Sequence, residues 1–314
     1  MDLSVETPPI TTERARLNRG YTIALTGVLF WSTTAIFITY LLKNYPLAPM
    51  TLAFWRDLFV AIALAIGLAL FQRRALRIEA RDRRFLIAYG LALMLMNATW
   101  TFSVALNGAA VSTVLVYSSP GITAIAARFF FKERFGFVRA MAFIASLIGC
   151  VLVAKANDPA QWNVNAAGII IGILSAFGFS SYSLMGKVVA HRKINSWTAT
   201  LGAFSVAAIA LLFIALISLA LAGNGDTLLS LGAHFDGWLL LVVLAVIPTL
   251  GGYGLYAASL GYLPTGTSNL IATLEPALTT ILAYILLHES LTISQLIGGV
   301  LIVASVISLR LEER

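Results

Sequence analysis

The sequence has 314 residues, of which 59% are hydrophobic and only 11% are charged, and its mean hydropathy is +0.89. Soluble domains carry about 25% charged residues, so this composition excludes a soluble globular protein and predicts a polytopic membrane protein. The formal net charge of +7 does not indicate nucleic-acid binding, because the basic residues lie in short segments between apolar runs. A single cysteine, Cys150, excludes an intramolecular disulfide and a metal site built from several cysteines.

The chain is expected to begin with a short cytoplasmic tail over residues 1–18. This segment carries acidic residues and Pro8-Pro9 ahead of any apolar run, unlike a signal peptide. Apolar runs separated by charges and turn residues then predict ten transmembrane helices in an all-α integral membrane fold. The helices are expected over residues 20–42, 50–72, 84–106, 108–131, 136–154, 164–187, 196–222, 237–260, 265–287 and 292–310.

The basic residues predict how these helices are oriented in the membrane. Of the 21 lysines and arginines, all but Lys43, Lys155 and Arg56 fall in the tails and loops on the side of the N-terminus. Loops rich in lysine and arginine stay in the cytoplasm, so both termini are expected to be cytoplasmic. The longer connection over residues 223–236 has no lysine or arginine and is expected on the outer side.

An internal repeat organises the chain. Pro120 is followed 13 residues later by Glu133, and Pro276 is followed 13 residues later by Glu289. Each half holds five predicted helices, an odd number, so the second copy is expected to be inverted relative to the first. Inverted repeats around a site at the membrane midplane are the construction of many secondary transporters. The same offset of 156 residues aligns further pairs, which are Trp100 with Tyr256, Ser103 with Ser259, and Ser112 with Ser268.

The pattern extends beyond the proline and the glutamate. In each half the glutamate is followed six residues later by Arg139 or Gln295, and sixteen residues later by Gly149 or Ser305. This doubled pattern resembles the drug/metabolite transporter superfamily, whose members with EamA-type repeats have ten helices in two five-helix halves. The sequence departs from the resemblance at Ala142 and at Ser305, where the family commonly has glycine.

The resemblance implies a first repeat over residues 19–155 and a second over residues 156–314, around a central cavity lined by helices 1, 3, 4, 6, 8 and 9. It also implies export of a small solute from the cytoplasm across the bacterial inner membrane. Length, short tails and aromatic content are most similar to bacterial amino-acid exporters, particularly the aromatic amino-acid exporters. The expected partners are the lipid bilayer and a small-molecule substrate, an amino acid or a related metabolite; neither nucleic acid nor a cofactor is expected.

Glu275 is the first candidate for a functional residue. It lies near the middle of the predicted helix over residues 265–287, directly before Pro276, which is expected to bend that helix. A carboxylate at this depth is costly in the membrane and marks a functional site by default. Glu275 could bind a substrate ammonium group, carry a coupling proton, or bond a neighbouring helix. The corresponding residue of the first repeat is Ser119, so this charge occurs in one half only.

Arg56 and Asp57 form the second charged group within a predicted helix. Sequence neighbours on a helix do not face one another, so each is expected to find its partner elsewhere. Arg56 either extends along Trp55 to the outer membrane interface or takes part in an outer gate.

Aromatic and small polar residues within the predicted helices complete the candidate site. Flat amphipathic rings suit an apolar or aromatic solute, and neutral hydrogen-bonding groups can orient it. The candidate substrate-binding residues are Trp31, Asn97, Trp100, Tyr117, Ser119, Tyr182, Tyr253, Tyr256, Asn269, Thr273 and Glu275, and the candidate gating or kink residues are Arg56, Asp57, Pro120 and Pro276.

The sequence therefore predicts a secondary transporter that exports small organic solutes, with amino acids bearing apolar or aromatic side chains favoured. The three histidines all lie near helix ends, and no HExxH, Gly-x-Ser-x-Gly or Walker pattern occurs, so enzyme chemistry is not expected. Efflux of drugs or quaternary amines is the alternative within transporters. A channel or pore is the alternative from a different class.

Overall fold

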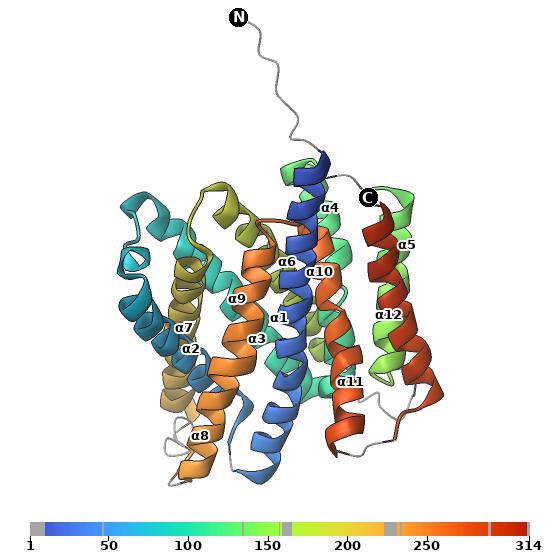
Figure 1. Ribbon diagram of the computed structural model, residues 1–314. Coiled ribbons are helices and arrows are strands. Elements are labelled where there is room, and N and C mark those ends of the chain that lie inside the picture. Colours follow the sequence, from blue (N-terminus) through green and yellow to red (C-terminus); the bar gives the residue numbers. More distant parts are fainter. Residues whose placement is uncertain are drawn as a thin grey trace, which may run out of the picture.

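The computed structural model describes residues 10–45, 47–133, 135–156, 158, 165–222, 231–232, 234–287 and 290–312 (Figure 1). Across these residues all regular structure is helical. In the first half the elements are α1 (Ile10–Asn44), α2 (Pro49–Phe71), η1 (Arg73–Leu76), α3 (Ala80–Val116), α4 (Ser119–Phe131) and α5 (Phe137–Val153). In the second half they are α6 (Ala166–His191), α7 (Ser196–Ala222), α8 (Phe235–Leu244), η3 (Ala245–Thr249), α9 (Leu250–Ser259), α10 (Thr265–Ala272), α11 (Leu274–Leu287) and α12 (Ile293–Glu312).

The helices have the lengths and compositions of membrane spans. Within the described part of the chain, eight helical stretches are long and apolar enough to cross a membrane, and α5 is a shorter apolar helix. The predicted helix over residues 265–287 is present as α10 and α11, which follow one another through the bundle (Figure 1). The prediction of an all-α integral membrane protein is confirmed. The start of α1 and the end of α12 lie at the same end of the bundle, which we call the terminal end (Figure 1).

The first helix begins earlier in the chain than predicted. Helix α1 begins at Ile10, directly after Pro8-Pro9, whereas the first helix was expected from residue 20. Proline disfavours helical backbone at the residue before it but suits the start of a helix, so a helix beginning just after the two prolines is natural. Glu13 in the first turn adds a favourable interaction with the helix dipole.

Two matching hairpins show the internal repeat directly. The hydroxyl groups of Ser103 and Ser112 are 2.8 Å apart, although a straight helix would separate these residues by about 14 Å. The chain of α3 must therefore fold back between them, close to the predicted connection at Asn107. In the second half Ser259 Oγ donates to Ser268 Oγ over 3.3 Å, across the connection from α9 to α10. These are the two serine pairs that the sequence repeat aligned.

Each half also has a helix interruption ahead of its proline. The helical backbone breaks at Tyr117 and Ser118 before Pro120, and at Thr273 before Pro276. Proline lacks the N–H that would bond the carbonyl one turn earlier, and its ring crowds that carbonyl, so the break falls within the preceding turn. Glu289, which completes the second copy of the pattern, lies outside the described residues.

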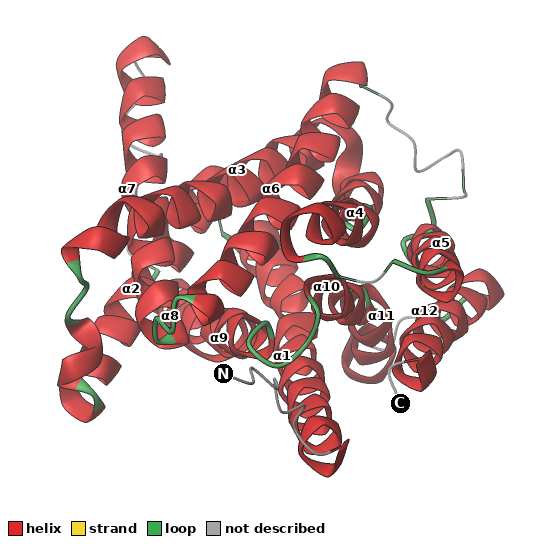
Figure 2. Ribbon diagram, turned by 90° about the horizontal axis from the view of Figure 1, so that it is seen from above, coloured by secondary structure: helices red, strands yellow, loops and turns green. Residues whose placement is uncertain are grey.

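Helices α5 and α12 pack against each other at one edge of the bundle, and α2 and α7 form the opposite edge (Figure 2). A Cβ added at Gly149 would lie 2.7 Å from the carbonyl oxygen of Gly298, so the α5–α12 crossing needs glycine there. Between the two edges, α1 packs against α9 and α3 packs against α6. This exchange of equivalent partners is the pattern that two inverted copies produce, and the four helices enclose the centre of the molecule.

Candidate functional site

A cavity of about 290 Å³ lies at the centre of the bundle. It extends from the middle of the helices away from the terminal end, because its walls include the second half of α1, the last residues of α5 and the turns of α11 that follow Pro276. Its lining residues are Trp31, Thr34, Ile38, Arg56, Met96, Asn97, Trp100, Thr113, Val116, Tyr117, Val153, Ala154, Phe179, Tyr253, Glu275, Pro276, Thr279 and Thr280.

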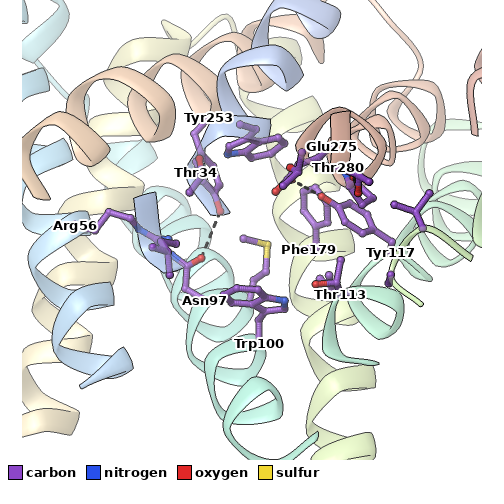
Figure 3. A pocket seen from close by; sticks show the side chains of 18 residues that line it. Thr34, Arg56, Asn97, Trp100, Thr113, Tyr117, Phe179, Tyr253, Glu275 and Thr280 are labelled. Atoms are coloured by element: carbon purple, nitrogen blue, oxygen red, sulfur yellow. Dashed lines mark hydrogen bonds between the residues drawn. The ribbon is translucent and has the colours of Figure 1, made fainter. Parts of the chain in front are cut away.

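Glu275 forms the acidic wall of the cavity. The break at Thr273 ends α10 and starts α11 at Leu274, which sets Glu275 in the first turn of a new helix. The Tyr117 hydroxyl, at the corresponding break of the first half, donates a hydrogen bond to the Glu275 carboxylate. The two interrupted helices are thus joined across the repeats, and the carboxylate still faces the cavity (Figure 3).

Arg56 forms the basic wall on the opposite side, where it reaches toward Asn97 (Figure 3). The expectation that Arg56 and Asp57 have separate partners is wrong. Arg56 Nε and Nη2 both donate to Asp57 Oδ1 over 3.2 Å, because the long arginine side chain folds back along α2. Arg56 is only 7% exposed, so it does not extend to the outer interface. Asp57 is fully buried behind it, and its other oxygen accepts from Asn97 Nδ2 over 3.0 Å.

Aromatic rings close the cavity toward the terminal end. The Trp31 ring lies edge-on to Tyr253 with centroids 4.6 Å apart, and it is 6.1 Å from Phe179 and 5.3 Å from Tyr256. Trp31 fits here because Gly252 of α9 has no side chain: a Cβ at that position would lie 2.5 Å from the indole. The Tyr253 hydroxyl donates to Asn97 Oδ1 over 3.4 Å. Asn97 thereby connects these aromatic rings, which we call the aromatic floor, to the Arg56–Asp57 pair.

Seven candidate residues lie outside the cavity lining. Asp57 is behind Arg56, Pro120 is buried in α4, and Tyr182 stacks on Tyr89 with centroids 4.6 Å apart. Thr273 shares a hydrogen bond with Ser146 of α5 over 2.6 Å. The remaining three, Ser119, Asn269 and Tyr256, belong to one buried polar cluster on the terminal side.

Asn269 is the centre of this cluster. Its Oδ1 accepts from Ser119 Oγ over 2.9 Å, and its Nδ2 donates to Thr123 Oγ1 over 3.1 Å and to Ser183 Oγ over 2.9 Å. The Ser183 hydroxyl also lies 2.6 Å from the Tyr256 hydroxyl. All five residues belong to helices that meet here, and all five are buried, so the cluster seals the terminal side.

The repeat relates this sealed cluster to the open cavity. Under the offset of 156 residues, four members of the cluster correspond to four cavity-lining residues. Ser119 corresponds to Glu275, Asn269 to Thr113, Tyr256 to Trp100, and Thr123 to Thr279. Equivalent positions of the two repeats are therefore packed together on the terminal side of the molecule and separated around a cavity on the other side.

Links at the terminal end hold the second half against the first. The Glu133 carboxylate accepts from Thr265 N over 2.9 and 3.1 Å and from Thr265 Oγ1 over 3.0 Å, and so caps α10. Within the second half, Lys187 Nζ of α6 donates to the Leu263 carbonyl, just before α10, over 2.7 Å. At the other end the Tyr45 hydroxyl donates to Asp236 over 2.5 Å, and this bond to a carboxylate raises the pKa of Tyr45 to about 12.

Sequence reasoning missed several lining residues, among them Thr34, Met96, Thr113 and Phe179. Thr34 follows Trp31 by one helical turn, and Thr113 is the repeat equivalent of Asn269, so the helical period and the repeat offset were available signals. Met96 and Phe179 carry no such signal, since apolar residues occupy most positions of these helices. Within the described residues, no group of three or more His, Cys, Asp or Glu side chains could hold a metal ion.

The sequence pattern of the EamA-like transporter family matches residues 18–155 and residues 166–311. The chain belongs to the EamA-like transporter family. This membership confirms the resemblance to the drug/metabolite transporter superfamily. It also makes the protein a multi-pass membrane protein of a transporter fold.

Two relatives of this EamA-like protein come from Salmonella typhimurium. An "uncharacterized inner membrane transporter YicL" is 24% identical over 303 residues, which cover 94% of this chain and 96% of the relative. A "probable amino-acid metabolite efflux pump" is 26% identical over 288 residues, which cover 90% of this chain and 91% of the relative. A solved crystal structure, 18% identical, matches 95% of this chain and 99% of its own with a TM-score of 0.73, which supports the fold.

Proposed function

We propose that this EamA-like transporter is a secondary transporter that exports amino acids with apolar or aromatic side chains from the cytoplasm by alternating access. The observation that carries the proposal is the central cavity. Its volume of about 290 Å³ lies at the small end of the range for ligand sites, which suits a metabolite of amino-acid size. Its walls combine the rings of Trp31, Trp100 and Phe179 with the carboxylate of Glu275, which accepts a hydrogen bond from Tyr117.

The orientation of the protein follows from its basic residues. The loops that carry most of the lysines and arginines connect helices at the terminal end, so this end is proposed to be cytoplasmic. The cavity then extends toward the outside of the bacterial inner membrane, and the Asn269 cluster closes the cytoplasmic side. This is the arrangement of a carrier facing outward, in position to release an exported solute or to take one up again.

Glu275 is proposed to bind the ammonium group of the solute. A buried carboxylate that faces a cavity is suited to this task, because the solute's charge offsets the cost of burying the acid. Downhill export of an accumulated metabolite requires no coupling ion, so a proton-carrying role is not needed to explain transport.

Counterflow in proteoliposomes tests the proposed function. If the protein is a carrier, proteoliposomes loaded with unlabelled phenylalanine accumulate labelled phenylalanine transiently. If it is a channel, they show no counterflow. Phenylalanine, tryptophan, methionine and threonine are expected to move faster than lysine or aspartate. Equal rates for charged and apolar amino acids would contradict the assignment, and transport of a quaternary ammonium compound alone would favour drug efflux.

The variant Glu275→Gln distinguishes three roles for this residue. If Glu275 binds the ammonium group, the variant weakens solute binding by about 1.5–3 kcal/mol in both exchange and net transport. If it carries a coupling proton, pH-driven transport is lost while exchange persists. If it only bonds Tyr117, transport per folded molecule is unchanged and thermal stability falls. Ser119→Ala is the control at the equivalent position of the first half.

A further inference from the structure

The guanidinium group of Arg56 is held in a fixed position with one edge unoccupied. Its Nε and Nη2 atoms share a single oxygen of Asp57, and the second Asp57 oxygen is occupied by Asn97. Within the described residues, no acceptor bonds Arg56 Nη1. Because Asp57 is itself held by Asn97 from α3, the guanidinium plane is fixed before any solute arrives.

The unoccupied edge is on the cavity side of the pair. Arg56 lines the cavity, whereas the side chain of Asp57 has no exposed surface. A guanidinium edge with two parallel N–H groups matches the two oxygens of a carboxylate. A purely structural ion pair would need no such edge facing an internal cavity.

A further polar group of the cavity has the same character. The hydroxyl of Thr34 is buried and has no hydrogen-bond partner in the described part of the chain. Trp100 also lines the cavity and is only partly buried. Buried polar groups are normally satisfied, so unsatisfied ones lining a cavity indicate positions that a ligand or water completes.

We propose that the free edge of Arg56 binds the carboxylate of the transported solute while Glu275 binds its ammonium group, so that the cavity selects zwitterions. This inference rests on the proposed function and adds the second contact that an amino acid requires. The two groups stand on opposite sides of the cavity (Figure 3), and the rings of Trp31 and Phe179 also line it. A solute bound between them has its side chain against the rings of Trp31 and Phe179.

The selection follows from the charges that face the cavity. These are Arg56, which is ion-paired with Asp57 over 3.2 Å, and Glu275. An amine without a carboxylate leaves the Arg56 edge unpaired, and a carboxylic acid without an amine leaves Glu275 facing another negative charge. A buried hydrogen-bonding edge without an acceptor is costly, and so is a second negative charge beside Glu275, so both kinds of analogue are expected to bind more weakly than the zwitterion.

The test compares three ligands on the full-length protein. L-Phenylalanine carries both charged groups, phenethylamine lacks the carboxylate, and 3-phenylpropionate lacks the amine. Each competes against labelled phenylalanine in counterflow. On the unmodified protein, each analogue is expected to compete at least about tenfold more weakly than phenylalanine. Equal competition by phenethylamine and phenylalanine overturns the proposal without any variant.

A paired variant then locates the carboxylate contact. Arg56→Gln combined with Asp57→Asn removes both charges and avoids leaving Asp57 unpaired. This variant is expected to weaken competition by phenylalanine about tenfold or more and to leave competition by phenethylamine unchanged. The matched control is Arg139→Gln combined with Glu312→Gln. These two residues form an ion pair over 3.4 Å and do not line the cavity, so their replacement is expected to leave competition by both ligands unchanged.

The outcomes separate this inference from the proposed function. Suppose that the unmodified protein transports phenylalanine and that the paired variant weakens competition by phenylalanine and by phenethylamine equally. Arg56 then does not bind the carboxylate, and the proposed function stands. The same conclusion holds if neither ligand is weakened. If the unmodified protein transports no amino acid, the proposed function fails and this inference fails with it.

Discussion

Glu133→Ala is expected to weaken the seal at the terminal end. The carboxylate makes three contacts of 2.9–3.1 Å with the backbone N–H and hydroxyl of Thr265, the first residue of α10. Losing a helix cap costs about 0.5–2 kcal/mol, and a hydrogen bond to a charged group contributes about 1.5–3 kcal/mol. Thr265 is fully buried and would keep an unsatisfied N–H, so we expect about 2–3 kcal/mol of destabilisation.

Thermal unfolding in detergent measures this effect. The control is Glu79→Ala, which removes an exposed acid at the same end of the bundle, paired over 2.8 Å with the exposed Arg81. Exposed ion pairs contribute about 0–1 kcal/mol, so the control is expected to melt close to the unmodified protein. The effect of Glu133→Gln should be intermediate, since the amide oxygen still accepts a hydrogen bond but carries no charge. If Glu133→Ala has the same melting temperature as the Glu79→Ala control, the capping argument is refuted.

Three further predictions concern orientation, the cavity and helix packing. Lys43→Cys is expected to react with an impermeant thiol reagent added from outside, and Glu79→Cys is expected to be spared; the reverse pattern would invert the topology. Trp100→Ala should weaken binding of aromatic solutes by about 1–3 kcal/mol with little loss of expression, and unchanged affinity in a binding assay would remove Trp100 from the site. Gly149→Ala places a Cβ 2.7 Å from a backbone oxygen of α12 and should destabilise the protein by about 1–3 kcal/mol, whereas Gly121→Ala, which meets nothing within 4 Å, should not; equal melting of the two contradicts the packing argument.

The architecture could be read from the sequence because membrane helices are specified by simple composition. Apolar runs must form helices in lipid, so the spans followed from hydropathy, and the odd number of spans in each half implied inversion. The break at Thr273 followed from Pro276, because a missing N–H disrupts the preceding turn whatever the surroundings. The start of α1 at Ile10 was missed because polar residues extend that helix beyond its apolar run.

The details of the site were less predictable because they depend on side-chain rotamers and on contacts between distant helices. The pairing of Arg56 with its neighbour Asp57 contradicts the simple helix rule, since a long flexible side chain can fold back to an adjacent residue. Glu133 was recognised as part of a pattern, but its role as a cap for Thr265 depends on the approach of two helices from different repeats. Phe179 gave no signal at all among the many apolar residues of α6.

The correspondence between the sealed cluster and the cavity has a consequence for how this protein can change over generations. In the proposed cycle, the ratio of inward-facing to outward-facing carriers depends on the difference in stability between two equivalent seals, one at each end. A substitution at Asn269 or Tyr256 alters one seal and therefore shifts that ratio. A second substitution at the repeat equivalent, Thr113 or Trp100, can restore the ratio without restoring either seal. The inverted duplication thus gives the protein pairs of positions at which the two directions of opening can be rebalanced.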